Sequence, residues 1–307
     1  MSSYSACGKF ILTGEHFILY GTPAIALPWL SASLQLLPKE GSSSEHPHHV
    51  EIFPAIQQAW QAARKRFALP TTDNFPFEIR SEIPQGSGFG SSAALCLTLL
   101  EAAAQEAQQD LTIAQKIKAA TELESLFHGR SSGLDPAVVA NRCPLRFTMD
   151  GGWSPFAWRL QGCGFVLAVS PQSRQTAEAV AKVKRYADAH PKAFQVILDD
   201  MHQLLQDLES TITQPKGDET QAAQEMGERL TFNHQLLQQV GISTPALDRL
   251  VEVACQNGAW GAKLTGAGLG GAMFAFAPLD KLNDVAEALQ NEDIKHCAIY
   301  HPNPPKQ

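Results

Sequence analysis

The sequence predicts an α+β fold made of two closely packed parts. The first part alternates strand-like apolar runs with helical segments around a glycine-rich loop. Beyond about residue 175 the chain becomes largely helical, and it ends with strands on either side of a second glycine-rich turn. Strands and helices distributed in this way are typical of α+β proteins. We expect an N-terminal domain over residues 1–155 and a C-terminal domain over residues 156–307, joined around residues 150–170.

The N-terminal part is expected to open with two strands, at residues 9–12 and 24–36, separated by GEHFILYGTP, which has turn residues at both ends. Helix-like spacing follows over residues 55–67, and FPFEIRSEI at residues 75–83 predicts the next strand. The glycine-rich loop comes directly after this strand.

Two helices are predicted after the loop, because strong helix formers occupy residues 91–107 and about 112–127. The segment HGRSSGLD then ends the second helix and starts another short one. Apolar runs between residues 144 and 170 predict three strands with turns between them.

The C-terminal part contains a helix whose two ends can be predicted. Thr244 and Pro245 suit its N-cap and its first helical position, and Gly258 suits its C-terminal cap. AWGAKLT and AMFAFAP then predict strands on either side of GAGLGG, followed by a helix from Leu279 and a last strand, KHCAIY.

Composition limits the classes of partner. Lys and Arg number 24 against 31 Asp and Glu, a net charge of −7, which argues against nucleic acid or an anionic membrane surface but not against a small anionic ligand. No signal peptide is evident, and no run of 18 apolar residues occurs. The six cysteines are scattered without a C-x-x-C pair, as in a reducing compartment. We therefore expect a cytoplasmic protein with small-molecule partners, for which a homodimer is possible.

The stretch IPQGSGFGSSAALCLTLL, residues 83–100, replaces large side chains by small ones at the junction of a strand and a helix. Such a loop presents backbone N–H groups at the positive end of the helix dipole, where phosphate commonly binds. Glycine would let a polyphosphate approach the main chain closely. A tight turn that needs positive φ explains the loop equally well, and the loop alone leaves both interpretations open.

Two common phosphate loops are excluded. A P-loop needs a lysine after its last glycine, and none follows Gly90. A dinucleotide fold needs glycine or alanine at position 91, which is Ser91, and an acidic residue at the end of a second strand about twenty residues on. The paired hydroxyls of Ser91 and Ser92 suit a complex of Mg²⁺ with phosphate better than a dinucleotide.

Three other stretches point to the same chemistry. AKLTGAGLGG is a second glycine-rich turn, and GKFILTGEH places a lysine and a Glu-His pair near a strand. ELESLFHGRSSGLD carries Glu124 on a helix and Asp135 beyond its break, so that one carboxylate can hold a metal while the other faces a substrate. Each feature singly is more often structural than catalytic, but all four together in one chain are much harder to explain as structural.

The combination resembles the GHMP kinases, the family of galactokinase, homoserine kinase, mevalonate kinase and phosphomevalonate kinase. PQGSGFGSSAA is similar to their phosphate-binding motif, and GAKLTGAGLGGAMFAF to their third motif. GKFILTGEHFILYGTPAIA and ELESLFHGRSSGLDPAV resemble mevalonate kinases most closely, and FNHQLLQQVGISTPALDRL matches the helical segment before the third motif. The resemblance covers nearly the whole chain. It implies an N-terminal domain with a left-handed βαβ unit and a ferredoxin-like C-terminal domain.

The resemblance also implies roles for individual residues. Lys9 and Asp135 would be the catalytic pair, and Ser92 and Glu124 would bind Mg²⁺. The expected substrate-side residues are Lys9, Glu15, His16, Asp135 and, less directly, Thr176. The expected residues around the ATP phosphates are Gly86, Ser87, Gly88, Phe89, Gly90, Ser91, Ser92, Gly266, Ala267 and Gly268. The implied reaction is ATP-dependent phosphorylation of the 5-hydroxyl of mevalonate, a step of isoprenoid synthesis.

The sequence departs from the family pattern at Phe89, Pro136 and Leu269, none of which removes a reacting group. Phosphomevalonate kinase is the nearest alternative, and its phosphorylated acceptor needs additional cationic groups. Arg130 is one candidate for such a group, although it also fits an ordinary surface arginine.

Another GHMP small-molecule kinase remains an alternative, and galactokinase fits less well because Phe17 and Ile18 follow the Glu-His pair. From a different class, a catalytically inactive nucleotide sensor would not need the four reacting side chains. Asp135 has one structural alternative, the cap of its short helix.

Overall fold

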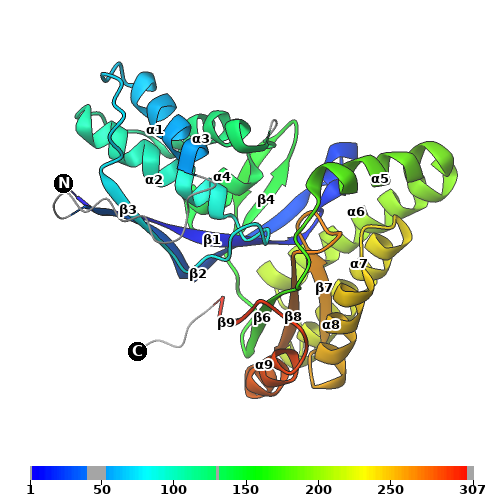
Figure 1. Ribbon diagram of the computed structural model, residues 1–307. Helices are drawn as coiled ribbons and strands as arrows, with labels where there is room; N and C mark the ends of the chain where they lie inside the picture. The colour runs from blue at the N-terminus through cyan, green and yellow to red at the C-terminus, as the bar shows by residue number, and fades with distance from the viewer. Residues whose placement is uncertain (1, 40–52, 129–130, 303–307) are drawn as a thin grey trace. The chain divides into compact units, whose positions relative to one another are not determined.

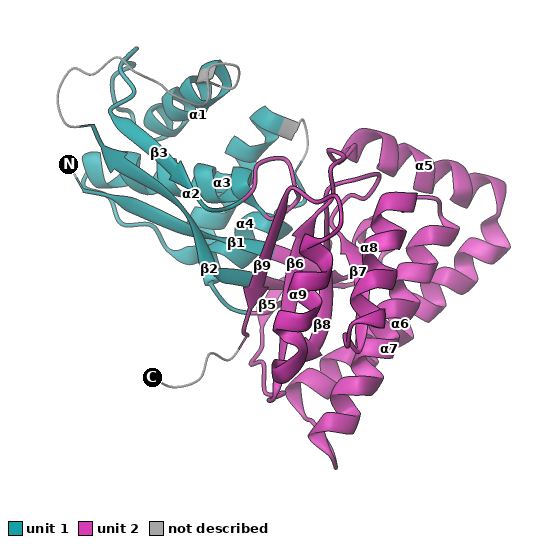
Figure 2. Ribbon diagram, turned by 60° about the horizontal axis from the view of Figure 1, so that its bottom comes forward, with its two compact units in different colours: residues 1–9, 28–83, 90–143 teal, residues 10–27, 84–89, 144–307 magenta. Residues whose placement is uncertain are grey.

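A computed structural model describes residues 2–39, 53–128 and 131–302 of the chain (Figure 1). The chain divides into two compact units, described below as far as those residues extend: unit 1 contains residues 1–9, 28–83 and 90–143, and unit 2 contains residues 10–27, 84–89 and 144–307 (Figure 2). Both units therefore draw on residues from the first third of the sequence. The domain boundary expected near residue 155 stays a prediction.

The secondary structure follows the predicted order closely. The strands are β1 (Tyr4–Thr13), β2 (Ala24–Pro38), β3 (Phe77–Ser81), β4 (Leu145–Thr148), β5 (Gly152–Pro155), β6 (Cys163–Val169), β7 (Gly261–Thr265), β8 (Ala272–Pro278) and β9 (His296–Tyr300). The helices are α1 (Phe53–Arg66), α2 (Ser91–Glu106), α3 (Ile113–His128), α4 (Leu134–Asn141), α5 (Thr176–Ala189), α6 (Pro191–Thr213), α7 (Glu219–Gln239), α8 (Pro245–Gln256) and α9 (Leu282–Gln290), with short 3₁₀ helices η1 (His16–Tyr20) and η2 (Leu279–Lys281). The α+β class is confirmed.

The first sheet has the strand order β1-β2-β4-β5, with β3 also paired to β2. Strand β2 pairs antiparallel with β4 through its first residues and antiparallel with β3 through its last. Strands β3 and β4 therefore point the same way along β2, and α2, α3 and α4 connect them. This connection makes β3, these helices and β4 a βαβ unit in which β2 separates the two parallel strands.

Helix α2, in unit 1, follows directly after the glycine loop. The helix begins after Gly90, whose φ is +82°, and its Ala- and Leu-rich sequence buries most of its side chains. It packs against α1, α3 and α4. Small residues such as Ala93, Ala94 and Ala103 allow these helices to approach closely, and all three are fully buried. The loop that precedes α2 is thus attached to a well-packed helix.

The sheet of unit 2 has the strand order β7-β8-β6-β9, with every pair antiparallel. Taken with the helices between the strands, this is the βαββαβ order of a ferredoxin-like domain, as expected. Helix α8 has the predicted ends: the Leu247 amide donates to the Thr244 hydroxyl (3.3 Å), Pro245 is the first helical residue, and Gly258, with φ of +106°, follows the C-cap.

Alternation along the strands gives this sheet two different faces. Val166, Ala168 and Met273 belong to the core that the helices of unit 2 cover. Phe165 and Phe274 point to the opposite face, where both rings contact Phe10 of β1, with centroids 5.2 and 5.4 Å apart. Both faces of the sheet are therefore buried, which explains its continuous apolar runs.

The structure bears on two features noted in the sequence, namely long apolar segments and the six cysteines. In the described parts of the chain, no helix combines the length and the apolar character that a membrane crossing requires. All six cysteines are free thiols, and Cys7, Cys96 and Cys163 are buried. Burial raises the pKa of the Cys163 thiol to about 12, so this sulfur is protonated and unreactive at neutral pH.

Candidate active site

Lys9, on β1 in unit 1, lies against Gly90 and forms an ion pair with Asp135. Its Nζ lies 2.7 Å from Asp135 Oδ1, and its side chain is 2% exposed. A Cβ at Gly90 would stand 2.8 Å from Lys9 Cγ, so a side chain there would displace the lysine. Gly90 is therefore required for two reasons, its positive φ and the close passage of the Lys9 side chain.

Asp135 does not cap its helix. The N-cap of α4 is Gly133, with φ of +85° and no side-chain cap, while Asp135 is the second residue of the helix. Its carboxylate pairs with Lys9 and stays one-quarter exposed. The capping interpretation of Asp135 is therefore wrong, because this carboxylate pairs with a lysine and not with the backbone of the first turn.

Glu124, on α3, is buried beside this pair. Its carboxylate accepts hydrogen bonds from the Ser92 hydroxyl (2.8 Å) and the Ser131 hydroxyl (2.6 Å). Burial, followed by repulsion from Asp135, raises the pKa of Glu124, while the two serines and Lys9 lower it. Two carboxylates and one ammonium group thus leave an excess of negative charge at the start of α2.

These donors fit a magnesium ion. Glu124 and Ser92 offer hard oxygen atoms, and a buried carboxylate with a raised pKa gains from a nearby cation. Within the described residues, no group of three or more His, Cys, Asp and Glu side chains could hold a metal ion by itself. Such a site suits Mg²⁺, which commonly takes only one or two protein ligands and the rest from phosphate and water.

The first half of the glycine loop lies against the second glycine-rich turn, within unit 2. A Cβ at Gly271 would stand 2.9 Å from the Ser87 carbonyl oxygen, and one at Gly266 would lie 3.9 Å from Gly88 Cα. The Ser87 hydroxyl donates to the Pro84 carbonyl (2.7 Å) and accepts from the Phe89 amide (3.3 Å). These two hydrogen bonds stabilise the loop from within. Ser87 and Gly271, 184 residues apart in sequence, thus lie side by side within unit 2.

Glu15 and His16 follow β1 in unit 2. The Glu15 carboxylate forms an ion pair with Lys263 of β7, in which both side chains are fully buried. The Nε2 atom of His16 lies 2.7 Å from the Ala267 carbonyl oxygen, which can only accept, so Nε2 carries a proton. Burial lowers the pKa of His16, so its imidazole is neutral at pH 7 and its Nδ1 is an acceptor.

Two sequence families match the chain once this geometry is known. Residues 55–141 match the GHMP kinases N terminal domain, and residues 212–295 match the GHMP kinases C terminal family. The chain belongs to the GHMP kinases. The two-domain fold expected from the sequence is the fold of this family.

Individual relatives of this GHMP kinase share most of its length. Mevalonate kinase of Thermococcus onnurineus is 30% identical over 93% of this chain and 91% of its own. Mevalonate kinase of Pyrococcus abyssi is 32% identical with the same coverage. Among solved structures, L. major mevalonate kinase in complex with R-mevalonate has a TM-score of 0.81 at 22% identity and covers 98% of this chain and 95% of its own. This last likeness establishes the fold.

Sequence reasoning missed Arg174 of this kinase. A Cβ at Gly88 would lie 3.8 Å from Arg174 Nη1, and one at Gly271 would lie 3.1 Å from Arg174 Cβ. The guanidinium group therefore lies next to the glycine loop in unit 2. The only sequence signal was a single arginine just after a predicted strand, which does not distinguish it from a surface residue.

Two other candidates are less informative. Thr176 is exposed at the first position of α5, two residues after Arg174. Arg130, the cation that would have favoured a phosphorylated acceptor, lies outside the described residues.

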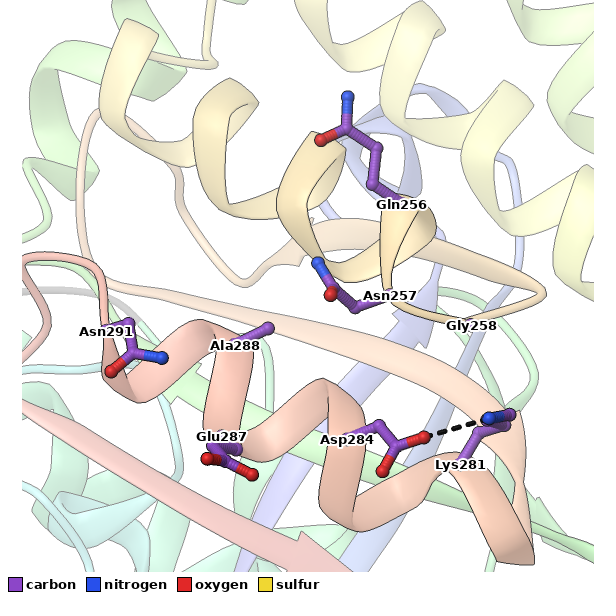
Figure 3. Close-up of a pocket in the computed structure, with 8 residues that line it drawn as sticks. All are labelled: Gln256, Asn257, Gly258, Lys281, Asp284, Glu287, Ala288 and Asn291. Carbon is purple, nitrogen blue, oxygen red and sulfur yellow. Dashed lines mark hydrogen bonds and ion pairs between the residues drawn. The ribbon is translucent and has the colours of Figure 1, made fainter.

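A separate polar pocket lies between the end of α8 and α9 in unit 2 (Figure 3). Lys281 and Asp284 form an exposed ion pair there at 2.9 Å. The lining residues are Gln256, Asn257, Gly258, Lys281, Asp284, Glu287, Ala288 and Asn291. None of the predicted site residues lines this pocket, so we do not assign the reaction to it.

Proposed function

We propose that this GHMP kinase transfers the γ-phosphoryl group of ATP to the 5-hydroxyl of mevalonate. The observation that carries the proposal is the ion pair of the buried Lys9 with Asp135, beside Gly90 at the start of the helix that the phosphate-binding motif opens. Curated relatives named mevalonate kinase, 30–32% identical over 93% of the chain, support mevalonate as the acceptor. The product would be 5-phosphomevalonate, a precursor in isoprenoid synthesis.

Asp135 and Lys9 would act on the acceptor hydroxyl. The hydroxyl oxygen forms a bond to the γ-phosphorus while the bond from that phosphorus to the β,γ-bridging oxygen breaks, and ADP leaves. Asp135 orients the hydroxyl and takes its proton, because its carboxylate is partly exposed and is held in place by the Lys9 ammonium group. Lys9 offsets negative charge that develops on the attacking oxygen and the phosphoryl group.

The glycine-rich segments would bind the triphosphate of ATP. Backbone N–H groups at the start of α2 lie at the positive end of its dipole, and side chains are absent where phosphate must come close. The residues proposed for this role are Gly86, Ser87, Gly88, Phe89, Gly90, Ser91, Ser92, Gly266, Ala267 and Gly268. Arg174, beside Gly88, adds a cation suited to a phosphate or carboxylate group of a bound ligand.

Ser92 and Glu124 would hold Mg²⁺, which supplies charge neutralisation for the β- and γ-phosphates when it is bound. The Ser131 hydroxyl that donates to Glu124 would fix the orientation of this carboxylate. On the acceptor side we propose His16 and Thr176, together with Glu15, which directly precedes His16 in the chain.

A panel assay tests the proposal. Purified protein with Mg–ATP is given mevalonate, phosphomevalonate, galactose or homoserine, and ADP and phosphorylated product are both quantified. We expect mevalonate to give the highest kcat/KM. Faster turnover of phosphomevalonate would replace the acceptor assignment, and ATP hydrolysis that is independent of every acceptor would refute the function.

A further inference from the structure

Three side-chain contacts join the end of β1 to β7 and its following turn, all within unit 2. The Thr265 hydroxyl accepts from the Ile11 amide (3.0 Å) and donates to the Ile11 carbonyl (2.8 Å). Glu15 pairs with Lys263, and His16 donates to the Ala267 carbonyl. We call these three contacts the β1–β7 clamp. They fix the segment that carries Glu15 and His16 onto the strand that leads into the second glycine-rich turn.

The central contact of the clamp is an unusual one. The side chains of Glu15 and Lys263 are both 0% exposed. The Lys263 ammonium also donates to the Leu264 carbonyl (2.7 Å) and lies 5.3 Å from the centre of the Phe274 ring. Removing two charges from water costs about as much as their attraction returns, so a buried pair is weak evidence for stability. Its use in this protein must therefore be sought in the geometry that it enforces.

That geometry concerns His16. Glu15 and His16 are adjacent in the chain, and their partners Lys263 and Ala267 lie four residues apart. Because the Glu15 carboxylate is directed at Lys263, the backbone of Glu15 and the start of η1 are held in one place. The neighbouring imidazole is held in the same way, with its Nε2 proton on Ala267 and its Nδ1 left as an acceptor.

Strand β7 is a firm base for this contact. The Leu264 amide, directly after Lys263, donates to His234 Nδ1 (3.3 Å), and His234 Nε2 lies 3.0 Å from Asp248. Helices α7 and α8, which carry these two side chains, both pack on β7. Movement of Lys263 away from Glu15 would therefore require displacement of a packed strand.

We infer that Lys263 is a positioning residue for the acceptor side of the site: its ion pair with Glu15 holds His16 in the orientation that binds the acceptor. The inference rests on the proposed function. It assigns to Glu15 an indirect role, because the carboxylate contacts Lys263 and acts through its neighbour. Loss of Lys263 should then weaken acceptor binding and leave the nucleotide side, formed by the glycine loops, nearly unchanged.

The first test compares Lys263→Met with Lys281→Met, which removes the lysine of an exposed ion pair in the same unit. Misplacement of a binding group by about an ångström costs on the order of 10- to 100-fold. We expect KM for mevalonate to rise by about 10-fold or more in Lys263→Met, with KM for ATP within about threefold of wild type. A lowered kcat with both KM values unchanged would overturn the inference, because it indicates only a smaller folded fraction.

A second variant separates positioning from folding. Lys263→Met leaves the Glu15 charge buried without its cation, whereas Glu15→Gln combined with Lys263→Met leaves no buried charge at either position. We expect the double variant to unfold at a higher temperature than Lys263→Met and to retain the raised KM for mevalonate. Wild-type kinetics in the double variant would refute the inference, since a neutral pair would then position His16 equally well.

Hydrogen exchange supplies a readout that does not depend on the acceptor. Peptides covering residues 14–20 of the folded double variant should exchange at least about tenfold faster than in wild type, while peptides from α2 in unit 1 exchange at the wild-type rate. Unchanged exchange in residues 14–20 would refute the clamp. If wild type fails to phosphorylate mevalonate but exchange in this segment still accelerates, the proposed acceptor is wrong and the clamp is retained.

Discussion

At the scale of single residues, a substitution at Asp135 distinguishes a catalytic role from a structural role. Asp135→Asn keeps the size of the side chain and removes its charge and its capacity to take a proton. Because Asp135 does not cap α4, the substitution should leave the helix intact. We expect kcat to fall on the order of 10²- to 10⁴-fold with ATP binding nearly unchanged, measured by steady-state kinetics and by nucleotide titration.

The matched control is Asp284→Asn, which removes a carboxylate from the exposed ion pair with Lys281 and should keep wild-type kcat. A folded Asp135→Asn enzyme that turns over within about threefold of wild type would remove Asp135 from the mechanism.

Glu124 is expected to lower the stability of the metal-free protein and to bind Mg²⁺. Its pKa in the folded protein is raised above its ordinary value, so the ionised carboxylate costs folding free energy at neutral pH, and this cost vanishes as pH falls below the ordinary value. We expect Glu124→Gln to raise the unfolding temperature of the Mg²⁺-free protein at pH 7 and to lower activity at every Mg²⁺ concentration. Thermal unfolding with and without EDTA, together with a magnesium titration of the rate, measures both effects.

A Glu124→Gln protein that unfolds at a lower temperature than wild type at pH 7 would contradict the stability argument. Wild-type activity across the magnesium titration would contradict the metal assignment instead, so the two halves of the prediction are judged separately.

At the scale of elements, His234 makes the joint of α7, α8 and β7 sensitive to acid. Burial lowers the pKa of His234 from 6.5 to about 4, although Asp248 acts in the opposite direction. Its Nδ1 accepts from the Leu264 amide, which only an imidazole without a proton at Nδ1 can do. Between pH 6.5 and about pH 4, His234 binds a proton in the unfolded chain but not in the folded protein. The free energy of unfolding therefore falls as pH falls through this range.

The loss attributable to His234 between pH 6.5 and pH 4 is on the order of 3 kcal/mol. We expect urea unfolding of His234→Gln to show a shallower dependence on pH in this window, by about one proton, at the cost of lower stability at pH 7. An identical pH dependence in the variant and in wild type would show that other groups account for the acid sensitivity.

Elements of this chain were predictable where the sequence carries a local signal. The cap residues Thr244 and Pro245 fixed the start of α8, and the glycines around residue 268 separated β7 from β8. The Lys9–Asp135 and Ser92–Glu124 contacts followed from the family motifs. The Glu15–Lys263 pair and the place of Arg174 did not, because each depends on segments brought together only by the tertiary fold. A lysine in a strand has no local feature that marks it as buried.

At the scale of the whole molecule, the fold class and family were predictable because four motifs occur in the right order along nearly the whole chain. The division into compact units was not, because it cuts through β1 and β2, each of which is one continuous strand. Local hydropathy cannot show that Lys9 and Phe10, neighbours in one strand, belong to different units. Such a division depends on which partners a strand finds, and the partners of these strands are distant in sequence.

The interleaving of the two units constrains how the nascent chain can fold on the ribosome. All residues of unit 1 have been synthesised once position 143 is complete, whereas unit 2 needs residues 10–27 from the beginning and β9 from nearly the end. Phe10 is therefore synthesised long before the rings of β6, β8 and β9 that it contacts in the folded protein. A gene cut after codon 143 would separate Glu15 from Lys263, so neither half is a portable module that recombination could transfer intact.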